Sequence, residues 1–189
     1  MRIAALLSGI ALACAVHASE DKLKAGVFDP PRAAPDFSLE GSDGGELKLS
    51  RYRGKVVVLG FGFSHCPEIC PTTLATLARA QKKLGAGAKE LQVVYVTVDP
   101  ERDSPERLRA YLAAFDPSFI GGTGSPERLA KVREAYGIFA ARIGGKDRYG
   151  FDHSSFVYLV DREGSLRALI PYGRSADDIA HDVAILLKK

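Results

Sequence analysis

Val56-Val57-Val58-Leu59-Gly60-Phe61-Gly62-Phe63 is a continuous apolar run that leads directly into Ser64-His65-Cys66-Pro67-Glu68-Ile69-Cys70-Pro71. Because apolar residues occupy successive positions without alternation, the run predicts a central strand that is buried on both faces. Apolar residues at helical spacing over 72–84 then predict a helix, and the run over 91–98 predicts a second strand. We therefore expect a βαβ unit that contains a parallel strand pair.

Turn residues and helix caps predict the elements on either side of this unit. Short alternating runs at 37–39 and 46–49, separated by a glycine-rich turn, indicate an N-terminal β-hairpin. The pentapeptide Ser-Pro-Glu-Arg-Leu occurs at 104–108 and again at 125–129. Each copy supplies a serine cap and a proline at the first helical position, so we expect two helix starts there.

The last part of the chain indicates a second hairpin and a closing helix. Strands are predicted at 155–160 and 165–170, joined through Asp161-Arg162-Glu163-Gly164, and an amphipathic helix is predicted over 177–187. A βαβ half followed by a hairpin and a covering helix, with a cysteine pair after the first buried strand, is typical of a thioredoxin-like domain. We expect the α/β class, with a central mixed β-sheet flanked by helices.

Length and composition limit the function classes. The chain has 189 residues, a formal net charge of +3 and 46% hydrophobic residues. This balance predicts one ordinary globular domain and gives no reason to expect a nucleic-acid partner. We expect a monomer. Three cysteines are too few for a disulfide scaffold, so each one needs its own explanation.

The N-terminal segment resembles an export signal. After Arg2, residues 3–16 form an apolar run that is too short to span a bilayer comfortably, and Val16-His17-Ala18 suits cleavage before Ser19. We therefore predict a signal peptide over 1–18 and a mature protein in the periplasm. Two alternatives stay open: lipidation at Cys14, in an imperfect lipobox, and retention of the segment as a short anchor.

The mature chain is predicted to begin with an arm. Residues 19–34 are polar, contain Pro30 and Pro31, and show no apolar period, which indicates a linker. The folded domain is therefore predicted over 35–189. If Cys14 leaves with the signal, Cys66 and Cys70 are the remaining thiols, and they lie in an oxidising compartment.

Cys66 and Cys70 stand four residues apart at a predicted helix start, which would place both sulfurs on one face. The partial positive charge of a helix N-terminus favours thiolate, the form that both metal binding and disulfide exchange require. The pair could also be a plain structural disulfide, although its closed loop is short and would stabilise the fold only modestly.

A metal would need a further ligand, and three histidines are candidates. His181 has acidic neighbours and is most simply a solvated or capping side chain, whereas His65 adjoins the cysteine pair and is a reserve ligand. His153 enters the predicted second hairpin from a glycine-bearing loop, and spacing alone favours an ordinary loop histidine. Two thiolates and one imidazole suit Cu(I), whereas a structural zinc site requires four ligands. Cu(II) would need an added water or carboxylate, for which Asp152 is a candidate.

Four motifs resemble the Sco/SenC family of copper-binding, thioredoxin-like proteins, and the resemblance covers residues 35–188. The motifs are Gly62-Phe63-Ser64-His65-Cys66-Pro67-Glu68-Ile69-Cys70-Pro71; Val98-Asp99-Pro100-Glu101-Arg102-Asp103-Ser104-Pro105; Asp116-Pro117-Ser118-Phe119-Ile120-Gly121 with Thr123-Gly124; and Asp152-His153-Ser154 before Tyr158-Leu159-Val160-Asp161. The resemblance implies that Cys66, Cys70 and His153 bind copper.

The same resemblance implies a role in assembling the binuclear copper centre of cytochrome c oxidase, as a copper donor, as a thiol reductant of the target cysteines, or as both. The expected partner is the copper-bearing subunit of that oxidase or another periplasmic copper protein. Many family members carry a membrane anchor, and the cleavable signal predicted here departs from that pattern. A metallochaperone of this kind is a binding protein rather than a turnover enzyme.

Other functions remain as alternatives. A thiol-disulfide oxidoreductase would use one of Cys66 and Cys70 to attack a partner disulfide and the other to resolve the mixed disulfide. Peroxide reduction is less favoured, because Thr72 and Thr73 follow the pair, and copper sensing rather than delivery is also compatible with the residues. Asp99 is predicted to shape a turn, although a strand-end carboxylate in this fold can also lie near the metal loop and meet a basic partner.

Asp103 and Ser104 are predicted to cap the next helix, and Glu101 and Arg102 to be solvated.

Overall fold

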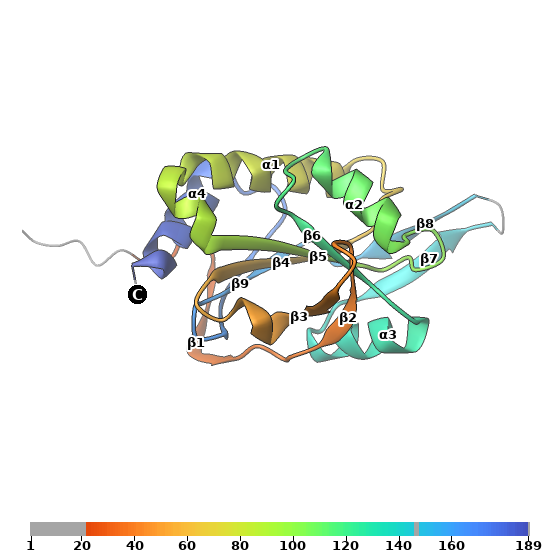
Figure 1. The fold of residues 1–189 in the computed structure, drawn as a ribbon, viewed down its shortest axis with the longest axis horizontal. Coiled ribbons are helices and arrows are strands. Elements are labelled where there is room, and N and C mark those ends of the chain that lie inside the picture. The colour runs from red at the N-terminus through yellow and green to blue at the C-terminus, as the bar shows by residue number, and fades with distance from the viewer. Residues whose placement is uncertain (1–21, 146–147, 189) are drawn as a thin grey trace, which may run out of the picture.

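The computed structural model describes residues 22–145 and 148–188, and its main feature is an eight-stranded sheet with the order β1-β10-β9-β4-β5-β6-β2-β3 (Figure 1). The strands of this sheet are β1 (Gly26–Ala33), β2 (Ser38–Gly41), β3 (Glu46–Lys48), β4 (Val56–Gly62), β5 (Leu91–Thr97), β6 (Ile120–Thr123), β9 (Val157–Val160) and β10 (Ser165–Ile170). The predicted signal peptide and Cys14 lie outside the described residues.

The centre of the sheet confirms the predicted βαβ unit. β4 and β5 are parallel, with Val58 opposite Val93, and every residue of both strands is buried. β6 extends the parallel part beyond β5, while β9 pairs with β4 in the antiparallel sense, so the sheet is mixed. The unbroken apolar run of β4 forms a strand because both of its faces are covered.

Helices cover both faces of this sheet. They are α1 (Ile69–Lys83), α2 (Pro105–Ala113), α3 (Pro126–Ala135) and α4 (Ala176–Leu187), and two 3-10 helices span Leu49–Tyr52 and Gly85–Glu90. Figure 1 shows α1, α2 and α4 on one side and α3 on the other. Ser104 and Ser125 cap α2 and α3 through their side chains, as the repeated pentapeptide predicts. α1 begins at Ile69, three residues before the predicted start.

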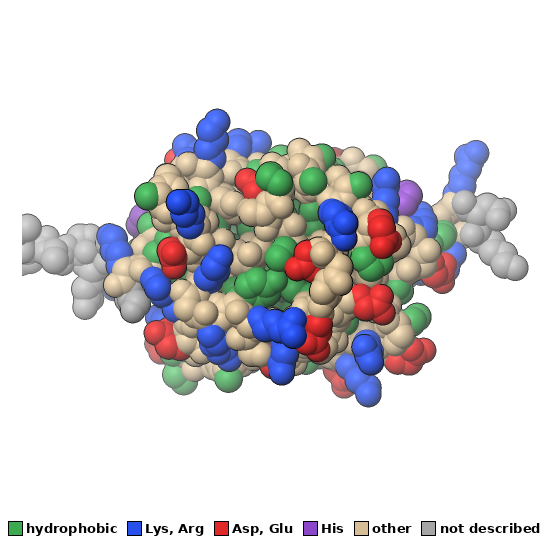
Figure 2. Space-filling view, in the orientation of Figure 1, with side chains coloured by type: hydrophobic (Ala, Val, Ile, Leu, Met, Phe, Trp, Pro, Cys, Tyr) green, Lys and Arg blue, Asp and Glu red, His purple; other side chains and the backbone are tan. Residues whose placement is uncertain are grey.

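The two predicted hairpins are also present. β2 pairs with β3 and β9 pairs with β10, both in the antiparallel sense. Basic and acidic side chains are interspersed over the face shown in Figure 2. No helix in the described part of the chain is both long enough and apolar enough to cross a bilayer.

The predicted linker arm over 19–34 is wrong for most of its length. Gly26–Ala33 forms β1, which pairs with β10 at one edge of the sheet. The residues just before it are also fixed, because the amides of Lys24 and Ala25 donate to the two carboxylate oxygens of Asp182 on α4, at 2.8 and 2.9 Å. The fold therefore begins well before residue 35.

A second sheet is absent from the sequence prediction. It pairs β7 (Ala140–Gly144) with β8 (Tyr149–His153), and Figure 1 shows this hairpin projecting from the body beyond α2. Among the described residues it shares no strand ladder with the eight-stranded sheet. Its importance is positional, since His153 is the last residue of β8.

Candidate metal centre

The two cysteines lie at the junction of β4 and α1, but only one belongs to the helix. Cys70 is the second residue of α1, whereas Cys66 lies in the preceding loop. The amide of Cys70 donates to the Sγ of Cys66 at 3.4 Å, so the sulfurs are neighbours although they do not share a helical face. Both are free thiols, and Cys66 is half-buried.

Cys70 occupies a dry position, with 2% of its surface exposed. Burial raises the pKa of its thiol to about 12, and the hydroxyl of Tyr95 beside it offsets only part of that rise. Burial therefore acts against the thiolate form, which the helix N-terminus is expected to favour. Gly62 makes the packing possible, since a Cβ there would overlap the Tyr95 hydroxyl and lie 2.7 Å from the Cys70 sulfur.

His153 reaches the same sulfur from β8. Its Nε2 lies 3.5 Å from the Sγ of Cys70, and its Nδ1 lies 2.8 Å from the carbonyl oxygen of Ser154. Because a carbonyl can only accept, Nδ1 carries the proton and the lone pair of Nε2 faces Cys70. Burial lowers the pKa of His153, which favours the neutral ring that binds metals.

Phe63 supports the histidine from the cysteine side. Its ring stands edge-on to the rings of Phe151 and His153, with centroid separations of 5.6 and 5.8 Å. Phe63 is the residue directly after β4 and is almost fully buried. An aromatic contact therefore joins the strand that precedes the cysteines to the strand that ends in the histidine.

The spacing of Cys70 and His153 fits a shared metal ion. Ligand bonds of about 2.3 Å to sulfur and about 2.0 Å to nitrogen at a tetrahedral angle, the values for zinc, would separate the two atoms by roughly 3.5 Å. The observed separation is 3.5 Å. No group of three or more Cys, His, Asp or Glu side chains in residues 22–145 and 148–188 is already gathered as a complete metal site, and the Cys66 sulfur is engaged by the Cys70 amide.

The other candidate residues make contacts of their own outside this pair. The imidazole of His65 is exposed and its Nδ1 contacts the Oγ of Ser64, while His181 contacts Asp182 on α4. Asp152 is exposed on β8, opposite Ala141. The Oγ1 of Thr73 donates to the carbonyl of Ile69 within α1.

The loop Asp99–Asp103 next to the site is more ordered than the sequence predicts. Asp99 shapes the turn as expected, because its carbonyl accepts from the amides of Arg102 and Asp103. The carboxylate of Asp103 is fully buried and bonds Ser64 and Thr97, so its predicted role as part of a helix cap is wrong and Ser104 alone caps α2.

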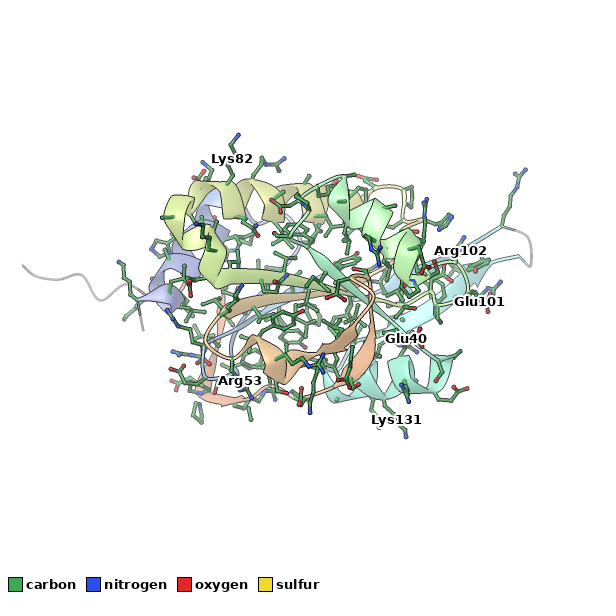
Figure 3. The ribbon with its side chains drawn as sticks, viewed as in Figure 1. Glu40, Arg53, Lys82, Glu101, Arg102 and Lys131 are labelled. Atoms are coloured by element: carbon green, nitrogen blue, oxygen red, sulfur yellow. The ribbon has the colours of Figure 1, made fainter. Side chains whose placement is uncertain are left out.

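The prediction that Arg102 is solvated is also wrong. Only 24% of its side chain is exposed, and it pairs with the buried Asp99 carboxylate. Glu101 has 63% of its side chain exposed, which agrees with the prediction that it is solvated. Figure 3 places the two labelled side chains beside the β7–β8 hairpin. The sequence gives little sign of this arrangement, because Tyr149 of the hairpin lies 47 residues after Arg102.

A groove opens beside the Cys70–His153 pair. Ile69, Cys70, Thr73, Tyr95 and His153 line a small cavity of about 10 Å³, together with Ser155, Phe156 and Val157. Thr73, Ser155 and Val157 also line a larger groove of about 520 Å³ between α1 and the start of α4. The buried cysteine–histidine pair therefore adjoins a surface on which another molecule could lie.

Known proteins share this sequence and architecture. The sequence profile of the SCO1/SenC family matches residues 28–188. A SCO2-like protein of Rickettsia conorii is 36% identical over 156 residues, which cover 81% of this chain and 72% of that protein. The structure of Bradyrhizobium japonicum ScoI with copper bound has a TM-score of 0.76 at 32% identity, covering 82% of this chain and 99% of that chain.

BsSco, a member of the Sco family of cytochrome c oxidase assembly proteins in which a disulfide switch was identified, is a further structural neighbour. It has a TM-score of 0.68 at 25% identity, covering 86% of this chain and 98% of that chain. Together these likenesses confirm the predicted thioredoxin-like α/β fold.

Proposed function

This chain belongs to the SCO1/SenC family, and on that premise we propose that it is a copper metallochaperone whose ligands are Cys66, Cys70 and His153. The observation that carries the proposal is the contact between Cys70 Sγ and His153 Nε2, with the imidazole lone pair directed at the sulfur. Two soft thiolates and one neutral imidazole favour Cu(I). Cu(II) would require an additional oxygen ligand, from water or a carboxylate.

Copper uptake is coupled to a proton in this proposal. A thiol must lose its proton before it binds a metal, and burial raises the pKa of Cys70 to about 12. Cys70 therefore keeps its proton at neutral pH and gives it up when copper binds. His153 needs no such step, because burial lowers its pKa and Nε2 is already free to bind.

The proposed recipient is the copper-bearing subunit of cytochrome c oxidase, or another periplasmic copper protein, which takes copper by ligand exchange. BsSco, a structural neighbour of this chain, is a member of a family of cytochrome c oxidase assembly proteins, and this supports the proposed recipient. The groove that shares Thr73, Ser155 and Val157 with the cavity at Cys70 gives it a place to approach. The periplasmic location rests on the signal peptide predicted over 1–18. A mature protein whose mass corresponds to a chain starting at Ser19 would support cleavage there. A lipid-modified Cys14 would contradict that cleavage but would still leave the domain in the periplasm.

The copper proposal is tested on the processed, fully reduced protein after anaerobic Cu(I) loading and desalting against a competing chelator. We expect one copper per wild-type molecule and strong loss in His153→Ala. His181→Ala is the matched control and should retain copper, because that imidazole contacts Asp182 on α4 instead. Failure of the wild type to hold copper, or equal retention by His153→Ala, would refute the three-ligand site.

A thiol-disulfide oxidoreductase is the second candidate, favoured by the unequal exposure of the two free thiols. The Cys66 thiolate would attack a partner disulfide and release one partner thiolate. The Cys70 thiolate would then attack the Cys66 sulfur and release the second, so that the partner gains two electrons and a Cys66–Cys70 disulfide forms. With oxidised glutathione as the probe, Cys70→Ser should trap a mixed disulfide and Cys66→Ser should not.

A further inference from the structure

The two halves of the proposed copper site come from different sheets. Cys66 and Cys70 follow β4 of the eight-stranded sheet, and His153 ends β8 of the two-stranded sheet. Residues 154–156 join His153 to β9 of the larger sheet, but no strand ladder holds β8 itself to that sheet in the described part of the chain. Side-chain contacts therefore help to set the distance between the sulfur and the imidazole. The loop Asp99–Asp103 contacts both halves.

One end of this loop fixes the cysteine half. Asp103 accepts the amide of Ser64 at 3.0 Å and its hydroxyl at 2.6 Å. It also accepts the hydroxyl of Thr97, the last residue of β5, at 2.6 Å. Ser64 lies two residues before Cys66, so the carboxylate of Asp103 ties the start of the cysteine loop to the sheet.

The other end of the loop fixes the histidine half through Tyr149, the first residue of β8. The guanidinium of Arg102 lies 3.7 Å from the centroid of the Tyr149 ring, and its Nη1 donates to the Tyr149 carbonyl at 3.2 Å. The Tyr149 hydroxyl donates to Asp99 at 3.1 Å, and the Nε of Arg102 donates to the other oxygen of the same carboxylate. Arg102 thus contacts the ring, the backbone and the carboxylate at once.

Arginine is the residue type that suits this position. Its planar guanidinium can stack on an aromatic ring while its N–H groups point in the plane, and a lysine ammonium cannot do both. Asp99 is 1% exposed, so its charge is compensated inside the protein by Arg102 rather than by water. Arg142 and Glu101 also contact Tyr149, but both are considerably more exposed.

We propose that the loop Asp99–Asp103 is a clamp that sets the separation of the cysteine and histidine halves, and that Arg102 is the positioning residue that holds His153 at Cys70. The inference rests on the copper function proposed above and concerns how firmly that site retains its cargo. With the clamp intact the site offers three ligands. With the histidine strand released it offers two, and copper passes more easily to a recipient.

The first test needs no copper. The His153 ring protons lie against the edge-on ring of Phe63 and should carry a ring-current shift in the NMR spectrum of the reduced protein. We expect Arg102→Ala to move these signals toward their free values and Arg167→Ala to leave them unchanged. Arg167 is the matched control, a similarly buried arginine that pairs with the buried Asp161 in the β9–β10 hairpin. Unmoved signals in Arg102→Ala would overturn the clamp.

The second test is a double-mutant cycle on Cu(I) affinity, measured by competition with a chelator. Loss of an outer positioning contact typically weakens metal binding about 10- to 100-fold. We expect Arg102→Ala to lose no more affinity than His153→Ala, and the double variant to match His153→Ala, because the arginine acts only through the histidine. Losses that multiply in the double variant would overturn the proposal.

Arg102→Lys keeps a positive charge beside Asp99, so it provides a test even if Arg102→Ala fails to fold. It should weaken Cu(I) binding without lowering the melting temperature as far as Arg102→Ala does, and wild-type affinity in Arg102→Lys would overturn the role of the planar guanidinium. A wild type that holds no copper would refute the proposed function instead. The NMR test would then still decide whether Arg102 positions His153.

Discussion

The cysteine half and the histidine half of the site are built in opposite ways. The cysteines follow β4, a central strand whose seven residues are all buried and which has a hydrogen-bonded neighbour on each side. His153 ends β8, a half-buried strand with β7 as its partner, and Ile143 on that partner is 54% exposed. One half is part of the core, and the other is attached to its surface.

This difference gives the two halves of the site different mechanical properties. The core half presents Cys70 in a fixed, dry position, where small changes of volume are costly. The histidine half depends on a small set of contacts through Phe63, Tyr149 and Arg102, so it can be loosened without unfolding the sheet. Substitutions in the two halves should therefore differ in what they damage.

The largest expected effect is that of Phe63→Ala, because this ring belongs to both halves. Phe63 is 3% exposed and contacts Phe151 and His153, so its removal leaves a cavity at their junction. We expect the free energy of unfolding to fall by about 3–5 kcal/mol in urea denaturation. Phe139→Ala is the control, since Phe139 is 58% exposed, and should change stability by less than about 0.5 kcal/mol. Similar losses in both variants would contradict the junction role.

A pair of glycine substitutions compares the halves directly. In Gly62→Ala the added Cβ would lie 2.7 Å from the Cys70 sulfur, whereas in Gly150→Ala it would meet Ile143 at 3.9 Å and Phe63 at 4.0 Å, which are ordinary contacts. Thermal and urea unfolding should show a loss of about 1–3 kcal/mol for Gly62→Ala. Gly150→Ala should stay within about 0.5 kcal/mol of wild type. Equal losses would mean that the two halves are packed alike.

Alkaline pH should act on the cysteine half. The pKa of Cys70 is raised from 9.0 to about 12 in the folded protein, so the folded state holds a proton that the unfolded chain releases. Its contribution to stability is complete below pH 9 and is lost as the pH rises toward 12. We expect the unfolding free energy of the reduced protein to fall more steeply above pH 9 in wild type than in Cys70→Ala. Parallel curves would exclude this linkage.

Acid should destabilise the histidine half, and by less than alkaline pH destabilises the cysteine half. Burial lowers the pKa of His153 below its ordinary 6.5, so the unfolded chain takes up a proton before the folded protein does. The stabilising effect is present above pH 6.5 and is lost as the pH falls through the lowered pKa. Denaturation of the metal-free protein should show less acid destabilisation in His153→Gln than in wild type. If His153→Gln loses as much stability in acid as the wild type does, a group other than His153 causes the acid destabilisation.

The sequence predicts the cysteine half of the site well, because residues that are buried in the core form a recognisable apolar pattern. The unbroken apolar run over 56–63 indicates β4, and the serine–proline starts at 104–108 and 125–129 indicate α2 and α3. The cysteine pair is identified as a candidate site by its place after that strand. The side-chain environment is not predicted, since the exposure of Cys70 depends on Tyr95, which reaches it from β5.

The sequence predicts the histidine half poorly because its residues form no buried face. β7 and β8 carry Arg142, Asp152 and an exposed Ile143, so alternation is too weak to indicate strands. His153 is recognised as a ligand through the family resemblance and not through spacing. Arg102 is missed for a related reason, because a buried arginine and a solvated one look the same until the contact with Tyr149 is known.

β1 also affects how this protein meets other copies of itself. It forms one edge of the eight-stranded sheet, and seven of its eight residues are exposed. An open edge can recruit a strand from another chain and begin aggregation, but Pro30 and Pro31 in the middle of β1 have no backbone N–H to donate. The pairing of β1 with β10 is also irregular between Val27 and Arg32. The same prolines that made residues 26–33 resemble a linker in the sequence thus make β1 a poor template for a growing fibril.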